Sequence, residues 1–149
     1  FSLLGLRHRL FTVGFAHQSN GRGEPLSRSW NRLWASFQFE RGNFVLAFKP
    51  WYRIPENSAY DNNPDIVDYA GRAELRSAYK YGEQVFSFIL RNNLRADENR
   101  SGYELDWSFP FSRRIKGVLQ FYNGYGESLI DYDVRTRRAG FGVLVEDWL

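Results

Sequence analysis

Three side chains with the chemistry of a nucleophile, a base and an orienting amide lie close together in the sequence, at Ser19, His17 and Asn31. Side chains alternate between the two faces of a β-strand, so a strand that reaches Ser19 places His17 and Ser19 on one face, in line with an apolar stripe. A second strand that begins near residue 30 places Asn31 at the head of another apolar stripe. If these strands pair as a hairpin, the three groups meet, which is the logic of a catalytic triad.

The elements that must position these residues are strands. Alternation of apolar and polar residues, bounded by turn residues, predicts eight strands, near residues 8–17, 30–39, 44–52, 66–80, 84–96, 102–109, 115–125 and 136–147. Short connectors at 41–43 and 81–83 alternate with longer polar segments at 21–29, 53–65 and 127–135. Tight turns at one end and long loops at the other are typical of outer-membrane barrels, and the three polar residues fall at the long-loop end.

The composition favours a sheet that meets lipid. Hydrophobic residues make up 43% of the chain and aromatic residues 18%, but no apolar run approaches the roughly 20 residues of a membrane helix. Alternating segments rich in aromatic residues suit a transmembrane β-barrel, although a soluble β-sandwich also alternates. The absence of cysteine excludes a disulfide scaffold. The net charge of +3 comes from scattered Lys and Arg, so no nucleic-acid partner is expected.

Several motifs together resemble one family. The segments HQSNG and SRSWN, which carry His17, Ser19 and Asn31, are similar to the outer-membrane phospholipase A family, and KPWY, DNNPDI and YNGYGESLIDY resemble it in the same order. The resemblance runs from about Phe11 to the C-terminus. It implies an all-β fold, an antiparallel transmembrane β-barrel, with about eight of the family's twelve strands. We expect residues 1–149 to form a single β-barrel domain that is a fragment lacking N-terminal strands.

The same resemblance implies a function. It predicts a calcium-dependent phospholipase of the bacterial outer membrane that hydrolyses acyl esters of phospholipids and is active as a homodimer. Ser19 would be the nucleophile, His17 the base and Asn31 the residue that orients the imidazole. The amide of Gly21 would face the oxyanion. A neutral asparagine stabilises the imidazolium less than a carboxylate does, so a further source of positive charge is expected.

The segment between the two catalytic strands offers oxygen ligands. Arg22, Glu24 and Ser27 lie there, and hard oxygen donors favour calcium. The resemblance assigns the ion to the Ser27 side chain and the Arg22 carbonyl, with a contribution from a partner subunit. Gln18 and Glu24 stand where the family often has Asp. We expect the difference at Gln18 to be silent. The longer side chain of Glu24, and Asn62 in the next loop, are the differences that we expect to affect an ancillary calcium ligand.

Two alternatives use the same pattern. One is a passive porin-like outer-membrane barrel, and the other is a soluble β-sandwich binding module such as a lectin.

Asp61, Asp65 and Asp68 are interpreted as parts of a polar loop rather than as a metal cluster. Val67 and Tyr69 are interpreted as outward residues of the strand over 66–80. The tryptophans are predicted to form interfacial girdles, at Trp30, Trp34, Trp51, Trp107 and Trp148.

Overall fold

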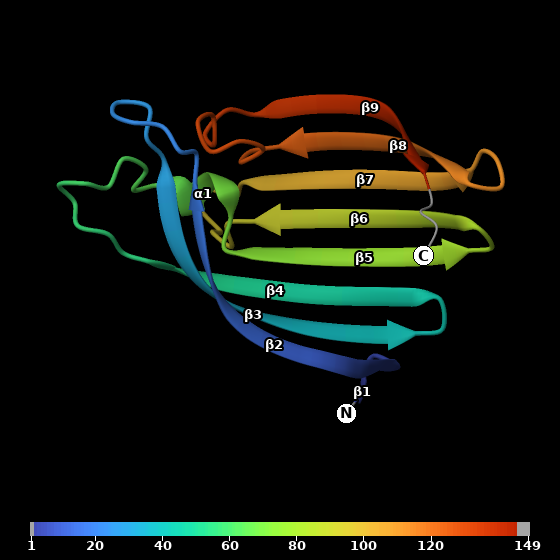
Figure 1. Cartoon of the computed structure of the whole chain (residues 1–149). Helices are drawn as coiled ribbons and strands as arrows, with labels where there is room; N and C mark the ends of the chain where they lie inside the picture. The colour runs from blue at the N-terminus through green and yellow to red at the C-terminus, as the bar shows by residue number, and fades with distance from the viewer. Residues whose placement is uncertain (1, 146–149) are drawn as a thin grey trace.

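A single antiparallel sheet makes up most of the chain. The structure is a computed structural model that describes residues 2–145. The strands are β1 Ser2–Leu3, β2 Leu6–Ser19, β3 Ser29–Arg41, β4 Phe44–Ile54, β5 Ala73–Tyr81, β6 Gln84–Asn92, β7 Ser101–Pro110, β8 Ile115–Gly124 and β9 Thr136–Val145. Each strand pairs with the next along the chain, in the order β1 to β9 (Figure 1). The prediction of an all-antiparallel sheet is confirmed, and the two-residue β1 is a strand that the sequence analysis did not predict.

Tight turns join the strands at one end of the sheet. Arg41 pairs with Phe44, and Tyr81 pairs with Gln84, so only two residues turn each chain. The first residue of each turn is a glycine with positive φ, a conformation that costs glycine little. Longer connections lie at the opposite end, at 20–28, 55–72, 93–100 and 125–135. The predicted alternation of short turns and long loops is therefore present.

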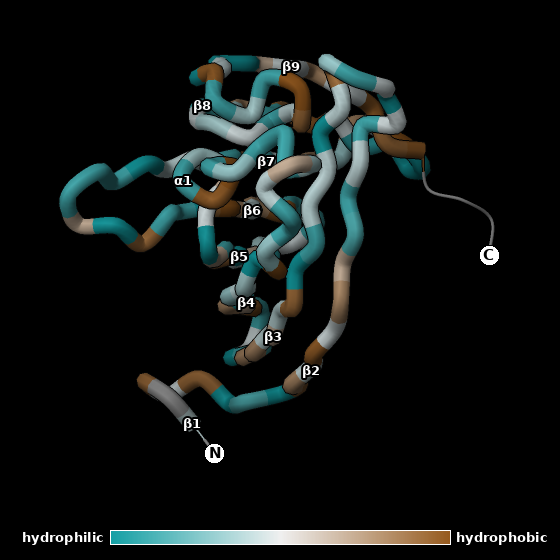
Figure 2. Tube along the Cα trace, turned by 90° about the vertical axis from the view of Figure 1, so that its left-hand side faces the viewer, coloured by the Kyte–Doolittle hydropathy of each residue, from teal (hydrophilic) through white to brown (hydrophobic). Residues whose placement is uncertain are grey.

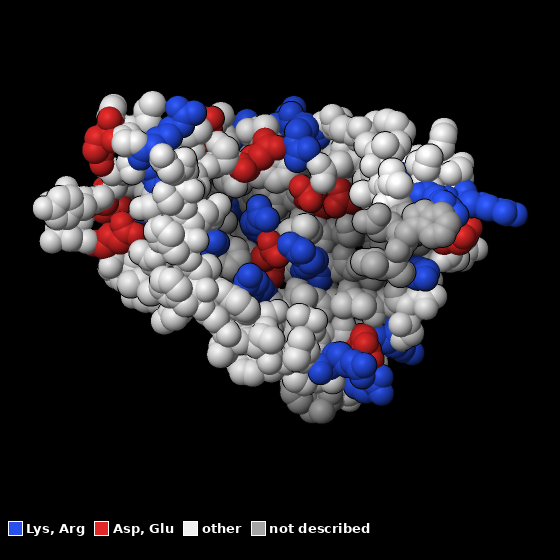
Figure 3. Space-filling view, in the orientation of Figure 1, with Lys and Arg blue, Asp and Glu red and all other residues white. Residues whose placement is uncertain are grey.

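The sheet curls into an open trough. In Figures 1 and 2 the β2–β3 hairpin bends away from the other strands and rises toward β9. The concave side holds a polar hollow of about 390 Å³, where charged side chains of both signs gather (Figure 3). The convex side carries the apolar residues of the alternation, such as the exposed Phe11, Val13 and Phe15. One curved sheet with an apolar outer face shows that the β-sandwich alternative is wrong.

A small hydrophobic cluster closes the trough at the long-loop end. Trp30, Ile66, Val67 and Tyr132 pack together, with Trp30 2% and Ile66 0% exposed. Ile66 and Val67 belong to a short helix, α1 Ile66–Ala70, which lies inside the curve of the sheet (Figure 1). No helix in the described part of the chain is long and apolar enough to span a membrane.

The helix corrects the strand predicted over 66–80. The amide of Ile66 donates to the carbonyl of Asn63 at 3.1 Å, which starts a helical turn, and β5 begins only at Ala73. Ile66 and Val67 are both buried, whereas a strand would place them on opposite faces, so the outward assignment of Val67 is wrong. Gly71 (φ 95°) then redirects the chain, and a Cβ there would lie 2.9 Å from a backbone oxygen of β6.

The strand predicted over 84–96 also ends early, at Asn92, because Asn93 leaves the ladder. The buried amide of Asn93 donates to the carbonyls of Asp68 and Glu98 at 3.0 and 2.8 Å. Its oxygen accepts from the backbone amides of Arg95 and Arg100. These bonds use both donors and both acceptor sites of an asparagine. The side chain thus replaces the ladder bonds that the turning backbone loses.

The interfacial role predicted for the tryptophans is wrong for three of them. Trp30 is in the buried cluster, and Trp34 and Trp51 line the inner hollow. Trp34 lies under the Lys49 ammonium at 4.3 Å, and Trp51 Nε1 donates to the Gly71 carbonyl at 2.9 Å. Trp107 is exposed and stacks on Phe86. Trp148 lies outside the described residues.

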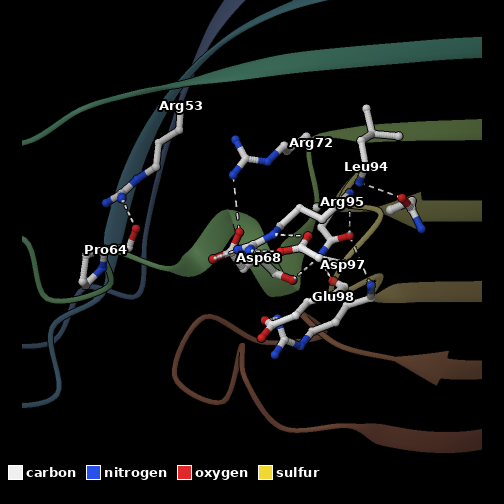
Figure 4. A network of polar contacts seen from close by, with 12 residues as sticks. Arg53, Pro64, Asp68, Arg72, Leu94, Arg95, Asp97 and Glu98 are labelled. Atoms are coloured by element: carbon white, nitrogen blue, oxygen red, sulfur yellow. Dashed lines mark hydrogen bonds and ion pairs between the residues drawn. The ribbon is translucent and has the colours of Figure 1, made fainter.

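The three loop aspartates are each paired with a donor. Asp61 bonds Arg53 at 2.7 Å, and Asp68 lies 3.3 Å from both Arg72 and Arg95 (Figure 4). Asp65 accepts a hydrogen bond from Tyr132, and burial, reinforced by this bond, raises the pKa of the Tyr132 hydroxyl. These contacts account for the carboxylates as parts of a folded loop cluster, in keeping with the sequence interpretation.

We expect Ile66→Ala to loosen the long-loop end. Removing a fully buried isoleucine side chain costs about 2–5 kcal/mol of the free energy of unfolding, and here the loss should appear as local opening of segment 55–72. Limited proteolysis and amide exchange of the detergent-solubilised full-length protein measure it. Val134→Ala, at an exposed loop position, is the control. Equal protection of 55–72 in the two variants would contradict the role of the cluster.

Candidate active site

The sheet register brings His17 and Asn31 directly opposite each other. They are cross-strand partners in the β2–β3 pair, and Ser19 faces Ser29 two residues further on. The Nδ1 atom of His17 lies 2.9 Å from Asn31 Oδ1. The predicted meeting of these residues on one face is therefore observed, and the ring nitrogen left for a serine proton is Nε2.

A second set of contacts lies on the inner face, behind these residues. Gln18, between His17 and Ser19, accepts hydrogen bonds from Trp30 Nε1 and from the Arg32 guanidinium, both at 3.1 Å. The Arg32 guanidinium also stacks over the Trp30 ring at 4.0 Å. The Gln18 side chain therefore links Trp30 and Arg32, the two inner residues that flank Asn31.

Ser19 ends β2 and lies beside the Gly21 amide. Gly21 N donates to Ser19 Oγ at 3.1 Å, which puts the predicted oxyanion donor next to the predicted nucleophile. Gly21 has φ 66°, a backbone conformation that other residues adopt only with strain. Among the described residues, Ser19 Oγ makes no hydrogen bond to His17.

Asn20 organises the loop that follows. Its side-chain oxygen accepts from the amides of Arg22 and Arg28 at 3.2 and 3.1 Å, and its Nδ2 donates to the Leu26 carbonyl at 2.8 Å. Its backbone amide donates to the Arg28 carbonyl. The sequence reasoning did not single out Asn20, although an asparagine between a strand and a glycine is a signal for a side chain that bonds nearby backbone.

The oxygen ligands predicted for calcium lie in this loop and its neighbour. Glu24 Oε1 accepts from Asn62 Nδ2 at 2.6 Å, so these two side chains are adjacent across two loops. The Ser27 carbonyl accepts from Arg28 at 2.7 Å, whereas the Ser27 hydroxyl and the Arg22 carbonyl make no hydrogen bond to the described part of the protein. No group of three His, Asp or Glu side chains within residues 2–145 is placed to hold a metal.

The loop after β4 makes hydrogen bonds to the start of β3, beside the candidate site. Asn63, only 1% exposed, accepts from the backbone amide of Ser29 at 3.1 Å. Glu56 Oε1 accepts from Asn31 Nδ2 at 3.3 Å. Neither side chain was assigned a role from the sequence, because its partner lies in another strand, although Asn63 is part of the DNNPDI motif.

An apolar groove opens on the outer face beside these residues. It has a volume of about 650 Å³ and is lined by Val13, Gly14, Leu33, Trp34, Ala35, Pro50, Trp51 and Tyr52. Phe15, next to His17 on the same stripe, is 59% exposed, and Leu33, next to Asn31, is 53% exposed. The candidate site therefore faces an apolar surface, whereas the charged hollow lies on the opposite side of the same strands.

Replacing Asn20 by alanine should release the 20–28 loop. The Arg22 and Arg28 amides would lose their acceptor. Losing the acceptor of such an amide lowers the free energy of local opening by about 1–3 kcal/mol. We expect amide exchange at both positions to accelerate roughly 5- to 150-fold on that scale. Asn57→Ala, which removes a similar turn bond to Ala59 in an exposed segment, is the matched control. Unchanged exchange at Arg22 and Arg28 would refute the organising role.

Comparison with known proteins gives consistent matches. The family described as Phospholipase A1 matches residues 1–145. Phospholipase A1 of Klebsiella pneumoniae is 37% identical over 99% of this chain and 50% of its own length, and that of Escherichia coli K12 is 40% identical over 91% and 45%. The chain thus spans about half the length of the curated relatives it matches.

Solved structures agree with the fold. The crystal structure of the Salmonella typhi outer membrane phospholipase dimer with bound calcium matches with a TM-score of 0.86 and 38% identity, over 98% of this chain and 55% of that chain. Outer membrane phospholipase A from Escherichia coli matches with the same TM-score and identity, over 100% and 60%. The strand order, the two-faced sheet and these matches together show that the chain belongs to the phospholipase A1 family and folds as part of its antiparallel transmembrane β-barrel.

Proposed function

We propose that the full-length protein is a calcium-dependent serine-type phospholipase of the bacterial outer membrane. The observation that carries this proposal is the 2.9 Å contact between His17 Nδ1 and Asn31 Oδ1, beside Ser19 and next to an apolar outer groove. Support also comes from a solved active-site mutant of Escherichia coli outer membrane phospholipase A, in which an asparagine is replaced by alanine. An asparagine thus belongs to the active site of that relative.

The two faces of the sheet suit a substrate that stays in the bilayer. The acyl chains of a phospholipid are apolar and match the outer groove, not the charged inner hollow. His17 and Ser19 lie at the long-loop end of the same stripe, which is where the ester groups of an outer-leaflet lipid would meet the barrel wall. The lipid would therefore reach the serine without leaving the membrane.

The reaction follows from the residue types. Ser19 Oγ attacks the ester carbonyl carbon, and its proton passes to His17 Nε2. The bond from that carbon to the glycerol oxygen breaks, and His17 returns the proton to this oxygen. Water then attacks the acyl-serine by the same route, which releases the fatty acid and restores Ser19. Asn31 holds the ring through Nδ1 in both steps.

Charge develops on the carbonyl oxygen during each attack. The Gly21 amide lies next to Ser19 Oγ and is the backbone donor available to this oxygen. Asn31 is neutral and supports the imidazolium only weakly, so the oxyanion requires further stabilisation.

The donor set of the two loops fits calcium. The Ser27 hydroxyl, the Arg22 carbonyl, the Glu24 carboxylate and the Asn62 amide oxygen are all hard oxygen donors, and Asn62 already contacts Glu24. Bound calcium would add positive charge beside the oxyanion. Calcium takes six to eight oxygen ligands, so water and a second copy of the chain would complete the shell. The matching Salmonella typhi structure is a dimer with bound calcium, and we extend the homodimer to this protein.

Ser19→Ala should abolish phospholipid hydrolysis by the full-length protein. Loss of the nucleophile removes the covalent route, and turnover should fall by on the order of 10⁴-fold or more. Release of fatty acid from mixed micelles measures turnover, and heat-modifiable gel mobility reports barrel folding. Ser112→Ala, in the exposed turn between β7 and β8, should be as active as the wild type. Full turnover in a folded Ser19→Ala variant would exclude the serine route, and conductance without hydrolysis in the wild type would favour the passive barrel.

Removing calcium should abolish activity reversibly, and Ser27→Asn should raise the calcium concentration needed for half-maximal activity by roughly 10-fold or more. The larger amide must displace a ligand water or push the loop outward. Chelator titration followed by calcium addition measures both effects. Ser58→Asn, at an exposed position of the next loop, is the matched control. Full activity in excess chelator, with metal removal verified by elemental analysis, would make the assignments of Ser27 and Arg22 wrong.

A further inference from the structure

Asn31 lies between two hydrogen-bonding partners rather than beside one. Its Oδ1 is 2.9 Å from His17 Nδ1, and its Nδ2 donates to Glu56 Oε1 at 3.3 Å. Asn31 is paired with Ile54 in the β3–β4 ladder, and Glu56 follows two residues after that partner. His17, Asn31 and Glu56 therefore form a continuous row across three neighbouring chain segments.

The row determines which end of the amide faces the histidine. A terminal amide torsion has two nearly equivalent settings, which exchange the oxygen and the nitrogen. An ionised carboxylate only accepts hydrogen bonds, so Glu56 can bond the NH₂ group but not the oxygen of Asn31. With the NH₂ group held by Glu56, the Asn31 oxygen must point at His17.

The orientation of the amide then selects the imidazole tautomer. An amide oxygen accepts only, so His17 Nδ1 must carry the proton, and Nε2 keeps the lone pair that a general base needs. With the amide reversed, its NH₂ group would face Nδ1 and favour a proton on Nε2. That is the tautomer that cannot accept the serine proton, and in serine proteases an incorrect tautomer costs about 10⁴ in turnover.

We propose that Glu56 is a positioning residue that holds Asn31 in the orientation required for His17 to act as the base. The proposal rests on the proposed function, in which His17 takes the Ser19 proton. It also assigns a carboxylate to a triad that has none among its three members, since Glu56 places a negative charge one amide away from the imidazole.

The tautomer itself provides a test that does not depend on hydrolysis. In full-length protein labelled with ¹⁵N-histidine and studied at a pH where the ring is neutral, the wild type should show His17 protonated on Nδ1. Glu56→Gln should give a mixture of tautomers, because a glutamine accepts and donates and so permits both amide settings. Glu83→Gln, in the exposed turn at the other end of the sheet, should resemble the wild type. An unchanged Nδ1-protonated ring in Glu56→Gln would overturn the proposal.

A double-substitution cycle tests the same idea through turnover. Asn31→Asp alone would set two carboxylates against each other, whereas Asn31→Asp combined with Glu56→Gln restores one carboxylate and one amide in exchanged places. We expect the combined variant to turn over about 10-fold faster than Asn31→Asp alone, a difference of about 1.4 kcal/mol in activation free energy between these two variants. If Glu56 only supported the loop, the second substitution would add its own loss, and such additivity would refute the proposal.

The two proposals fail in different ways. Turnover by a folded Ser19→Ala variant would remove the serine mechanism, while the His17 tautomer in Glu56→Gln would still report the hydrogen-bonded row. Loss of activity in Ser19→Ala, together with additive losses in the cycle and an unchanged tautomer, would leave the serine mechanism intact and exclude the role of Glu56.

Discussion

Burial of Trp30 is the constraint on which the candidate-site end of the sheet depends. Its ring packs against Ile66 and Tyr132, and its indole nitrogen bonds Gln18. Because strand residues alternate, an inward Trp30 obliges Asn31 to point outward, and an inward Gln18 does the same for His17 and Ser19. A slip of one residue in β3 would turn the tryptophan to the outer face and the asparagine into the trough. The packing of the inner residues therefore determines which side chains face outward at the candidate site.

The two faces of the sheet carry different kinds of side chain. Inside, Glu74 bonds Arg76 at 3.0 Å and Arg91 at 2.9 Å, so charges of both signs are paired within the hollow. Outside, the apolar stripe and groove lack such pairs and offer a surface suited to acyl chains. In the proposed reaction a lipid ester meets a polar site where the apolar stripe ends, and His17 and Ser19 are at that end. The position of the site thus follows from the amphipathic sheet.

Asparagine side chains hold the irregular backbone together at this end. Asn20, Asn63 and Asn93 each follow or face the end of a strand and accept hydrogen bonds from backbone amides there. An amide both donates and accepts, so one side chain can satisfy an amide and a carbonyl of a turning chain together. Asn31 uses the same property differently, since its two ends distinguish a carboxylate from an imidazole. The loops are therefore ordered without a large core.

The sequence alone determined most of the strands, the tight turns and the meeting of His17 with Asn31, because these depend on period-two alternation and on a hairpin between neighbouring segments. The motifs also indicated the family. Only the tertiary structure decided that residues 66–70 form a helix, that Trp30 points inward and that Glu56 bonds Asn31. Each of these depends on groups from separate loops that approach one another once the sheet has curled, and the local alternation of residues carries no record of such contacts.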